Sequence, residues 1–206
     1  YDPPGSEPQV NPGNDPRFPN QGYLDPSPDG IDAEFAWPRP DGTGFAGGDG
    51  AGTSVIDLER GWTINHQDLN AHGAALLHGT IRDGSRAHGT SVLGEICAVD
   101  NTLGCVGIAP GVASVDVVSY WGSTRANAIL AAIANLQFGD VLLLEAQLST
   151  TIGTTTWQNM PIEVLDAEFN TIRLASALGI VVVEAAGNGG NDLDTFANGA
   201  GDQIFN

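Results

Sequence analysis

The feature that most constrains the fold of this sequence is the alternation of short apolar runs with longer helix-like segments after residue 52. Strand-like runs lie at residues 53–56, 115–119, 141–144 and 180–184. Residues 141–144 are all apolar, which is typical of a strand that is covered on both faces. A β-α-β series of this kind predicts an α/β fold, with a parallel sheet and helices on both faces.

Three intervening segments have the pattern of helices. They are residues 89–98, 126–138 and 162–178. Ser123 or Thr124 is a candidate N-cap for the second helix. One stripe of the third helix carries Leu165, Phe169, Ile172 and Ser176, and Gly179 lies where a C-terminal cap belongs.

The first 52 residues differ from the rest in composition. They are rich in Pro, Gly, Asp and Asn, which predicts an extended arm with little regular structure. Six aromatic residues among the first 45 argue against a disordered linker. We therefore expect an arm, 1–52, that packs on a domain formed by 53–206, and residues 1–5 are typical of a processed end or an extended arm.

The charge excludes some classes of partner. The net charge is −18, with seven Arg and no Lys, so neither nucleic acid nor an anionic membrane is an expected partner. No apolar run approaches the length of a membrane span. The chain does not open on a charged and then apolar leader, so we expect that any signal peptide has been removed.

The two cysteines, Cys97 and Cys105, are eight residues apart. They are either small apolar residues in a helix and a loop, or a local disulfide of a secreted protein. The sequence leaves both alternatives open, because it does not show whether the two Cβ atoms meet.

Three polar residues stand where catalytic groups are often found. Asp57 follows a predicted strand, at the edge of a parallel sheet where ligands bind, and could orient an imidazole. His88 opens a predicted helix and could act as a general base. Asn188 follows a run of small residues and could donate a hydrogen bond to an oxyanion.

In their order and context, these residues resemble the blocks of a known family. Residues 54–57, 88–94 and 181–188 resemble the Asp, His and oxyanion-hole blocks of the subtilisin-like serine proteases (subtilases, peptidase family S8). The His block is similar without a gap over residues 88–110, which read HGTSVLGEICAVDNTLGCVGIAP. The resemblance implies a subtilisin-like fold in which Asp57, His88 and Asn188 are catalytic.

The nucleophile block of that family has no match in this chain. Gly52-Thr53-Ser54 leads into the Asp strand, and Gly89-Thr90-Ser91 lies within the His block, so neither provides the serine. We expect a secreted, extracellular serine endopeptidase made from a zymogen. Cleavage near Asn206 would leave the serine on a separate C-terminal chain, without which this chain is inactive and its fold incomplete.

Two alternatives come from other classes. The first is a non-catalytic binding protein with the subtilase fold, or an inactive fragment. The second is a doubly wound nucleotide-binding domain with 187–190 as a phosphate loop, which the spacing and the absence of Lys disfavour.

The resemblance also implies a groove for a protein or peptide substrate. Its expected residues are Tyr120, Gly122, Ser123, Glu145, Ala146, Gln147, Glu184, Ala185, Ala186 and Gly187. Glu145 stands where the family usually has Ser, and Glu184 where it has a small apolar residue. One alternative is that the two glutamates form an acidic wall of the pocket, which either selects a basic residue or works in its protonated form at low pH. The other is that one or both bind Arg or backbone donors away from the pocket.

A calcium site is the last implication of the resemblance. Side chains of Asp68 and Asn101 and carbonyls of Val99, Leu103 and Cys105 would suit a structural Ca²⁺. Gln21 is a further candidate, and the alternative is an empty, hydrogen-bonded loop. His66, His72 and His78 lack ligand spacing and are interpreted as surface residues.

Overall fold

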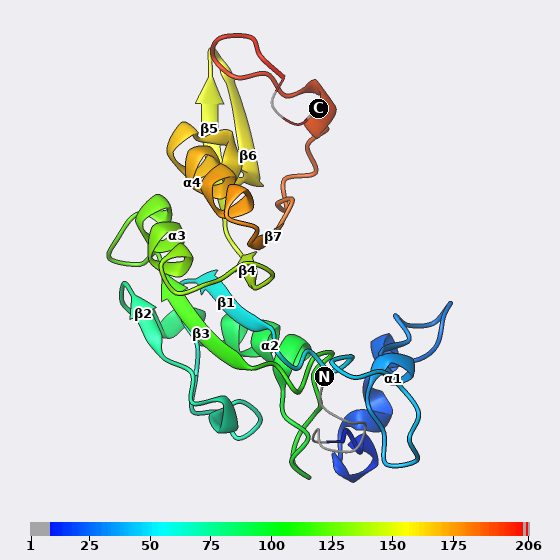
Figure 1. Cartoon of the computed structure of the whole chain (residues 1–206). Coiled ribbons are helices and arrows are strands. Elements are labelled where there is room, and N and C mark those ends of the chain that lie inside the picture. Colours follow the sequence, from blue (N-terminus) through cyan, green and yellow to red (C-terminus); the bar gives the residue numbers. More distant parts are fainter. Residues whose placement is uncertain (1–8, 204, 206) are drawn as a thin grey trace.

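A central sheet of five parallel strands organises the molecule (Figure 1). A computed structural model describes residues 9–203 and 205, so residues 1–8, at the start of the expected arm, lie outside the described part. The strand order is β2 (Leu76–His78), β3 (Ser114–Ser119), β1 (Ser54–Glu59), β4 (Val141–Leu144), β7 (Val181–Glu184). The predicted α/β fold with a parallel sheet is confirmed.

Helices cover both faces of this sheet, as predicted. On one face, α2 (Arg86–Cys97) packs against Val55 of β1 through Leu93 and Cys97. On the other, α3 (Arg125–Ile133) and α4 (Asp166–Ala177) pack against Ile56 and Leu58. Successive residues of β1 therefore alternate between the two apolar clusters.

Two ends of the predicted elements matter for the site. Strand β1 runs to Glu59, three residues beyond the predicted end at 56, because it continues to pair with β3 as far as Ser119. The N-cap of α3 is Thr124, whose side chain accepts a hydrogen bond from the backbone N–H of Asn127.

The predicted long helix at 162–178 is interrupted. A 3-10 turn, η6 (Ile162–Val164), is followed by Leu165 in an extended conformation before α4 begins. The predicted stripe on this helix is only partly right. Ile172 packs against the core, but Phe169 and Ser176 are exposed. The buried residues are Glu168, Thr171 and Ala175. The buried face of α4 is therefore not the face with the largest apolar side chains.

An antiparallel hairpin was not predicted. It consists of β5 (Gln147–Ile152) and β6 (Thr155–Pro161), and it projects from the end of the molecule opposite the arm (Figure 1). The segment after β7 packs against it, since a Cβ on Gly187 would lie 1.9 Å from the carbonyl oxygen of Asn159.

The described part of the arm consists mainly of short turns. They are η1 (Pro12–Asn14), η2 (Phe18–Asn20), η3 (Gly22–Leu24) and α1 (Ala33–Ala36); three more 3-10 turns, η4 (Asn70–His72), η5 (Asp83–Ser85) and η7 (Leu193–Thr195), lie further along the chain. Leu24 and Trp37 are buried in an apolar cluster with Val106. The indole of Trp37 also donates a hydrogen bond to the carbonyl of Ile108.

Strand β7 is an edge strand, which corrects the expectation of a buried one. Within the described residues it pairs only with β4. Val181 and Val183 are 50% and 48% exposed. An apolar edge of this kind is open to addition of a further strand or to cover by other polypeptide.

The cysteines do not form the disulfide that was one of the two alternatives. Cys97 is buried and donates to the carbonyl of Leu93, and Cys105 is a free thiol against Asp68. Among the described residues, we find no helix long and apolar enough to cross a membrane.

Candidate functional site

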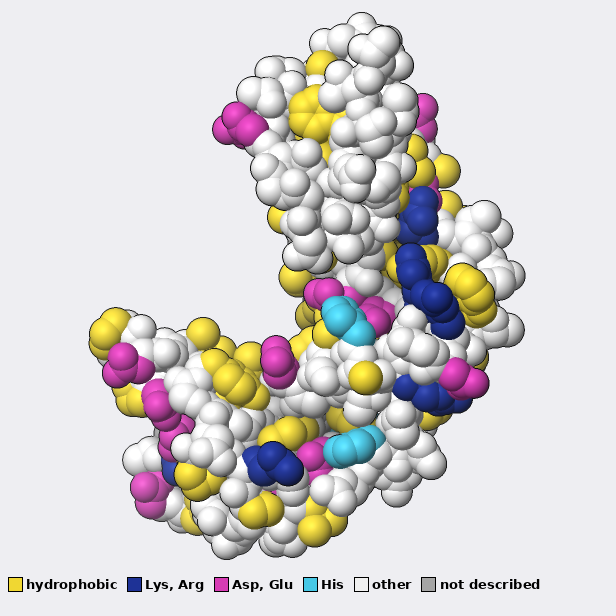
Figure 2. All heavy atoms as spheres, turned by 180° about the vertical axis from the view of Figure 1, so that it is seen from behind, with side chains coloured by type: hydrophobic (Ala, Val, Ile, Leu, Met, Phe, Trp, Pro, Cys, Tyr) yellow, Lys and Arg dark blue, Asp and Glu magenta, His cyan; other side chains and the backbone are white. Residues whose placement is uncertain are grey.

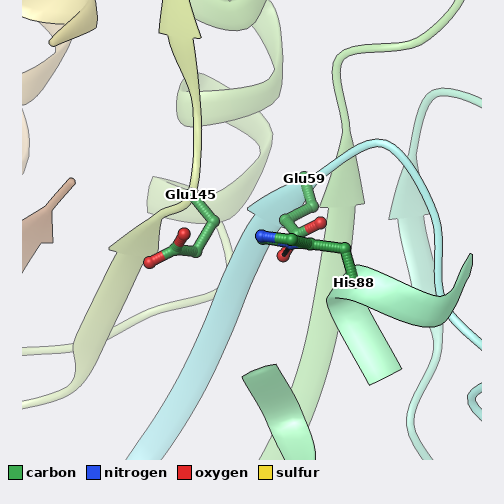
Figure 3. Close-up of side chains that lie close together, drawn as sticks. All are labelled: Glu59, His88 and Glu145. Atoms are coloured by element: carbon green, nitrogen blue, oxygen red, sulfur yellow. Dashed lines mark hydrogen bonds and ion pairs between the residues drawn. The ribbon is translucent and has the colours of Figure 1, made fainter. Parts of the chain in front are cut away.

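A carboxyl–histidine pair lies where β1 ends and α2 begins (Figure 3). The Nδ1 atom of His88 is 2.7 Å from Oε1 of Glu59, the last residue of β1. The Glu59 side chain is 4% exposed, whereas that of His88 is 64% exposed. In the tautomer with the hydrogen on Nδ1, the Nδ1–H group donates a hydrogen bond to Glu59. Nε2 then has a free lone pair and can accept a proton.

Asp57 does not occupy this position, which corrects the prediction that it orients His88. It is fully buried, and its Oδ2 accepts a 2.7 Å hydrogen bond from the indole of Trp62, while Oδ1 has no partner in the described structure. Asp57 and Glu59 face the same side of the sheet, because side chains repeat every two residues along a strand. Glu59 is the one of the two that reaches the strand end.

Trp62 is the physical reason for this arrangement. Its buried ring lies against the first turns of α2, since a Cβ on Gly89 would be 2.5 Å from the indole. The indole therefore covers Asp57. Burial, with the charge of Glu59 adding to it, raises the pKa of Asp57 well above its usual range.

Glu145 is a second carboxylate at the pair. It follows β4, the neighbour of β1, and Figure 3 shows it beyond the imidazole of His88. Ligand atoms of Glu59, His88 and Glu145 lie within 4.8 Å of one another, so these three side chains could hold a metal ion. Burial first, and then the charge of Glu145, raise the pKa of Glu59 to about 8, and Arg60 opposes this shift.

A pocket of about 290 Å³ opens beside the pair. Seven of the predicted residues line it: His88, Tyr120, Glu145, Ala146, Gln147, Ala185 and Asn188. Sequence reasoning missed four others: Glu59, Arg60, Gly84 and Ser85. The lining does not include the predicted Asp57, Gly122, Ser123, Glu184, Ala186 and Gly187.

Ser123 and Glu184 have other partners. The hydroxyl of Ser123 is 2.7 Å from Nε2 of His78. Oε1 of Glu184 accepts hydrogen bonds from the backbone N–H groups of Ile162 and Glu163, at 2.6 and 3.2 Å. Glu184 therefore stabilises the turn η6 and is not part of an acidic pocket wall. This is the second of the two alternatives, in which the carboxylate binds backbone donors away from the pocket.

Asn188 is exposed at the pocket, and Gln147 binds it. Oε1 of Gln147 accepts from both the backbone N–H and the side-chain Nδ2 of Asn188, at 3.0 and 3.2 Å. The donors expected at an oxyanion are thus present, and an incoming oxygen would have to replace the amide oxygen of Gln147.

The predicted calcium ligands are only partly available. Oε1 and Nε2 of Gln21 bind the backbone of Val106, so this side chain is engaged elsewhere. Oδ1 of Asn101 accepts from the N–H of Leu103, in its own loop. For Asp68, Oδ2 accepts from the N–H of Cys105 at 3.2 Å, but Oδ1 is buried without a described partner.

Asp15 is a candidate ligand that sequence reasoning missed. It is 1% exposed, and neither of its side-chain oxygens has a described hydrogen-bond partner. Burial first, and then the nearby carboxyl of Asp100, raise its pKa to about 6, and the nearby backbone N–H groups of Asn101 and Thr102 oppose this shift. Asp15 and Asp68 both raise the pKa of the Cys105 thiol, after burial, which places both carboxyls around the same loop. Such orphaned buried oxygens fit a hard cation like Ca²⁺. No clear signal in the sequence marks Asp15, because Arg17 lies two residues away and is a candidate partner for its carboxylate.

A parallel sheet with a buried carboxyl hydrogen-bonded to an exposed histidine at its strand ends defines a hydrolase-like α/β site. No family model matches the chain. Subtilisin DY of Bacillus licheniformis is 31% identical over 146 residues, which cover 69% of this chain and 49% of that protein. The subtilisin of Bacillus pumilus is 30% identical over 152 residues, covering 71% and 51%.

Solved structures show the same fold. A protease of Pseudoalteromonas arctica PAMC 21717 aligns with a TM-score of 0.56 and 21% identity over 84% of this chain and 57% of that one. A serine protease of Aeromonas sobria, solved with its chaperone, gives 0.53 and 22% over 85% and 33%. The chain is related to the subtilisin-like serine proteases, and it spans about half the length of the curated relatives described above.

Proposed function

We propose that this chain is the part of a serine endopeptidase that supplies the acid, the base and an oxyanion donor. The observation that carries the proposal is the 2.7 Å hydrogen bond between Glu59 and His88 at the mouth of a pocket. The relation to subtilisin-like proteases supplies the reaction class, hydrolysis of a peptide bond. In this proposal Glu59 replaces Asp57 as the orienting acid.

The residues would work in sequence. An ionised Glu59 accepts the Nδ1–H of His88 and leaves Nε2 free to take the proton of a serine hydroxyl as that oxygen attacks the carbonyl carbon. The imidazolium then returns the proton to the leaving amine. Asn188 can donate to the oxyanion once the substrate oxygen replaces Gln147.

The serine is proposed to come from polypeptide outside residues 1–206. The open edge of β7, with half-exposed Val181 and Val183, offers that polypeptide a place to continue the sheet. A separate C-terminal chain, produced from a zymogen by cleavage near Asn206, stays our prediction for its source. Export to the extracellular medium is likewise proposed, because the relatives are subtilisins.

We also propose a structural Ca²⁺ at the arm. Asp15 and Asp68 would supply side-chain oxygens, together with the loop at 99–105. Their orphaned, buried oxygens support this, because a buried carboxylate without a partner is costly. The ion would neutralise both carboxylates and fix the arm, without a part in the chemistry.

Glu145 is proposed to bind a basic side chain of the substrate. It lines the pocket, and its carboxylate forms no hydrogen bond or ion pair with a described residue, whereas its backbone N–H donates to the carbonyl of Leu58. A Glu145→Gln variant is expected to lose a preference for Arg or Lys next to the cleaved bond. Glu184→Gln is the matched control, because Glu184 lies outside the pocket lining, and equal loss in both variants would contradict the assignment.

The proposal is tested by fluorophosphonate labelling of the native preparation, followed by denaturing mass spectrometry of every polypeptide. We expect the label on a serine outside residues 1–206 and none on this segment. Complete absence of label would contradict a serine peptidase and favour the non-catalytic binding protein.

A further inference from the structure

Two arginines stand together beside the pocket of this strongly acidic protein. Arg60 follows β1 and lines the pocket. The backbone N–H of Arg82 donates to the carbonyl of Arg60 at 2.8 Å, which ties the two segments together. Figure 2 shows several Arg side chains following one another along one face, next to a histidine. Positive charge is thus gathered locally in a chain whose net charge is −18.

Aromatic rings hold both guanidinium groups in place. The guanidinium carbon of Arg60 lies 5.2 Å from the ring centroid of Tyr120, and its Nε donates to the Tyr120 hydroxyl at 2.8 Å. That of Arg82 lies 4.9 Å from the ring of Trp121, the next residue. A guanidinium held in this way loses little freedom when it binds a planar carboxylate.

Neither guanidinium group is held in an ion pair within the described structure, although the charge of Arg60 opposes the rise that burial causes in the pKa of the neighbouring Glu59. Arg39, Arg86 and Arg125 form ion pairs, with Glu34, Asp83 and Glu168 respectively. Arg60 and Arg82 form no ion pair with a described carboxylate.

The two carboxyl groups near Arg60 do not form ion pairs with it. Glu59 is bonded to His88, and Glu145 lines the same pocket as Arg60 without pairing with it. Arg60 lines the pocket, whereas Arg82 is exposed at the surface outside the pocket lining. An anion at Arg82 would therefore lie away from the two pocket glutamates.

We propose that Arg60 and Arg82 form a subsite for a carboxylate side chain of the peptide substrate. The inference rests on the proposed peptidase function and names its substrate class: peptides with Asp or Glu within a few residues of the cleaved bond. Two guanidinium groups offer paired N–H donors that match the oxygens of a carboxylate. The attraction is local, because charges further apart than about 10 Å are screened at ordinary salt.

The test compares matched peptides that differ by one Glu→Gln change, placed in turn at each position around the cleaved bond. The assembled native protein is expected to cleave the Glu peptide with a kcat/KM roughly tenfold higher at one or two positions. Arg60→Gln and Arg82→Gln should each remove most of this preference. Arg60→Lys should keep part of it, because the charge remains while the planar fork is lost.

Arg173→Gln is the control variant. Arg173 also lies over an aromatic ring, Phe169, at 5.7 Å, but it is outside the pocket lining, so its replacement should leave the preference unchanged. Equal cleavage of Glu and Gln peptides by the parent protein would overturn the subsite, as would a preference that survives in the Arg60→Gln, Arg82→Gln double variant. Failure to cleave any peptide, together with absence of fluorophosphonate label, would instead overturn the proposed function and the subsite's role with it.

Discussion

Replacing Glu59 with Gln is the change that most directly tests the site. Gln has the same shape, so the hydrogen bond to His88 can persist, but the negative charge disappears and the amide can act as a donor. The imidazole then loses the partner that fixes its tautomer and stabilises its protonated form. We expect kcat to fall while KM changes little in assays above pH 8, where the Glu59 carboxyl of the parent is ionised.

The size of this effect follows from the geometry. Nδ1 and Oε1 are 2.7 Å apart, and the Glu59 side chain is almost fully buried. Two unit charges about 4 Å apart interact by about 4 kcal/mol at an effective dielectric constant of about 20. Loss of that stabilisation from the imidazolium corresponds to about a 10³-fold fall in kcat.

Asp57→Asn is the matched comparison, because Asp57 lies on the same face of the same strand but binds Trp62. We expect this variant to keep kcat within a few-fold of the parent. Both variants would be measured by active-site titration and steady-state kinetics on one peptide substrate. A large loss of kcat in Asp57→Asn with little loss in Glu59→Gln would refute the reasoning and restore the assignment made from sequence.

Three further predictions concern stability. Burial is the largest cause that raises the pKa of Glu184 from 4.5 to about 7. The contribution of this carboxyl to the free energy of unfolding is therefore fully present below pH 4.5 and is lost as the pH rises through 7. Glu184→Gln should then equal the parent in denaturant unfolding near pH 4.5 and exceed it above pH 7, by about 1–2 kcal/mol after allowance for solvent screening. Removing Ca²⁺ with a chelator should lower the Tm by roughly 5 °C, and Asp15→Asn or Asp68→Asn should abolish that difference. Trp62→Phe should cost about 1–3 kcal/mol in the free energy of unfolding, because Asp57 loses its donor.

Each stability prediction has its own check. A constant difference between Glu184→Gln and the parent across this pH range would contradict the assignment of that carboxyl. Asp83→Asn serves as the calcium control, since Asp83 is exposed and pairs with Arg86; an equal effect there would point to general charge rather than a site. Trp121→Phe, at an exposed indole, should cost far less than Trp62→Phe.

Periodicity and local caps predicted the framework well. Strand 141–144 was placed to the residue, because a strand covered on both faces gives an unbroken apolar run. Thr124 was one of two candidate caps because its hydroxyl can accept from the first turn. The hairpin β5–β6 was missed because its Thr-rich strands lie partly exposed and lack a strong apolar pattern.

The site was harder to predict, since it depends on contacts between distant segments. Asp57 and Glu59 have the same chemistry and the same strand face. Trp62 covers Asp57, whereas Glu59 reaches the strand end and contacts His88. The role of Glu184 likewise depends on which backbone amides it meets, 22 residues earlier in the chain. A sequence pattern shows the residue types but not the contacts between residues that are far apart in the chain.

The arm joins the domain through contacts between residues far apart in the chain. Gln21 and Val106 are 85 residues apart, and Trp37 and Ile108 are 71 apart. Closing such long loops costs conformational entropy before the contacts form, so we expect the sheet to fold first and the arm to dock last. Asp15 reaches the loop near Asp68 only when the arm docks, so capture of a metal ion would complete folding rather than begin it. The lifetime of the docked arm, and with it resistance to unfolding, would then depend on the concentration of free ion around the protein.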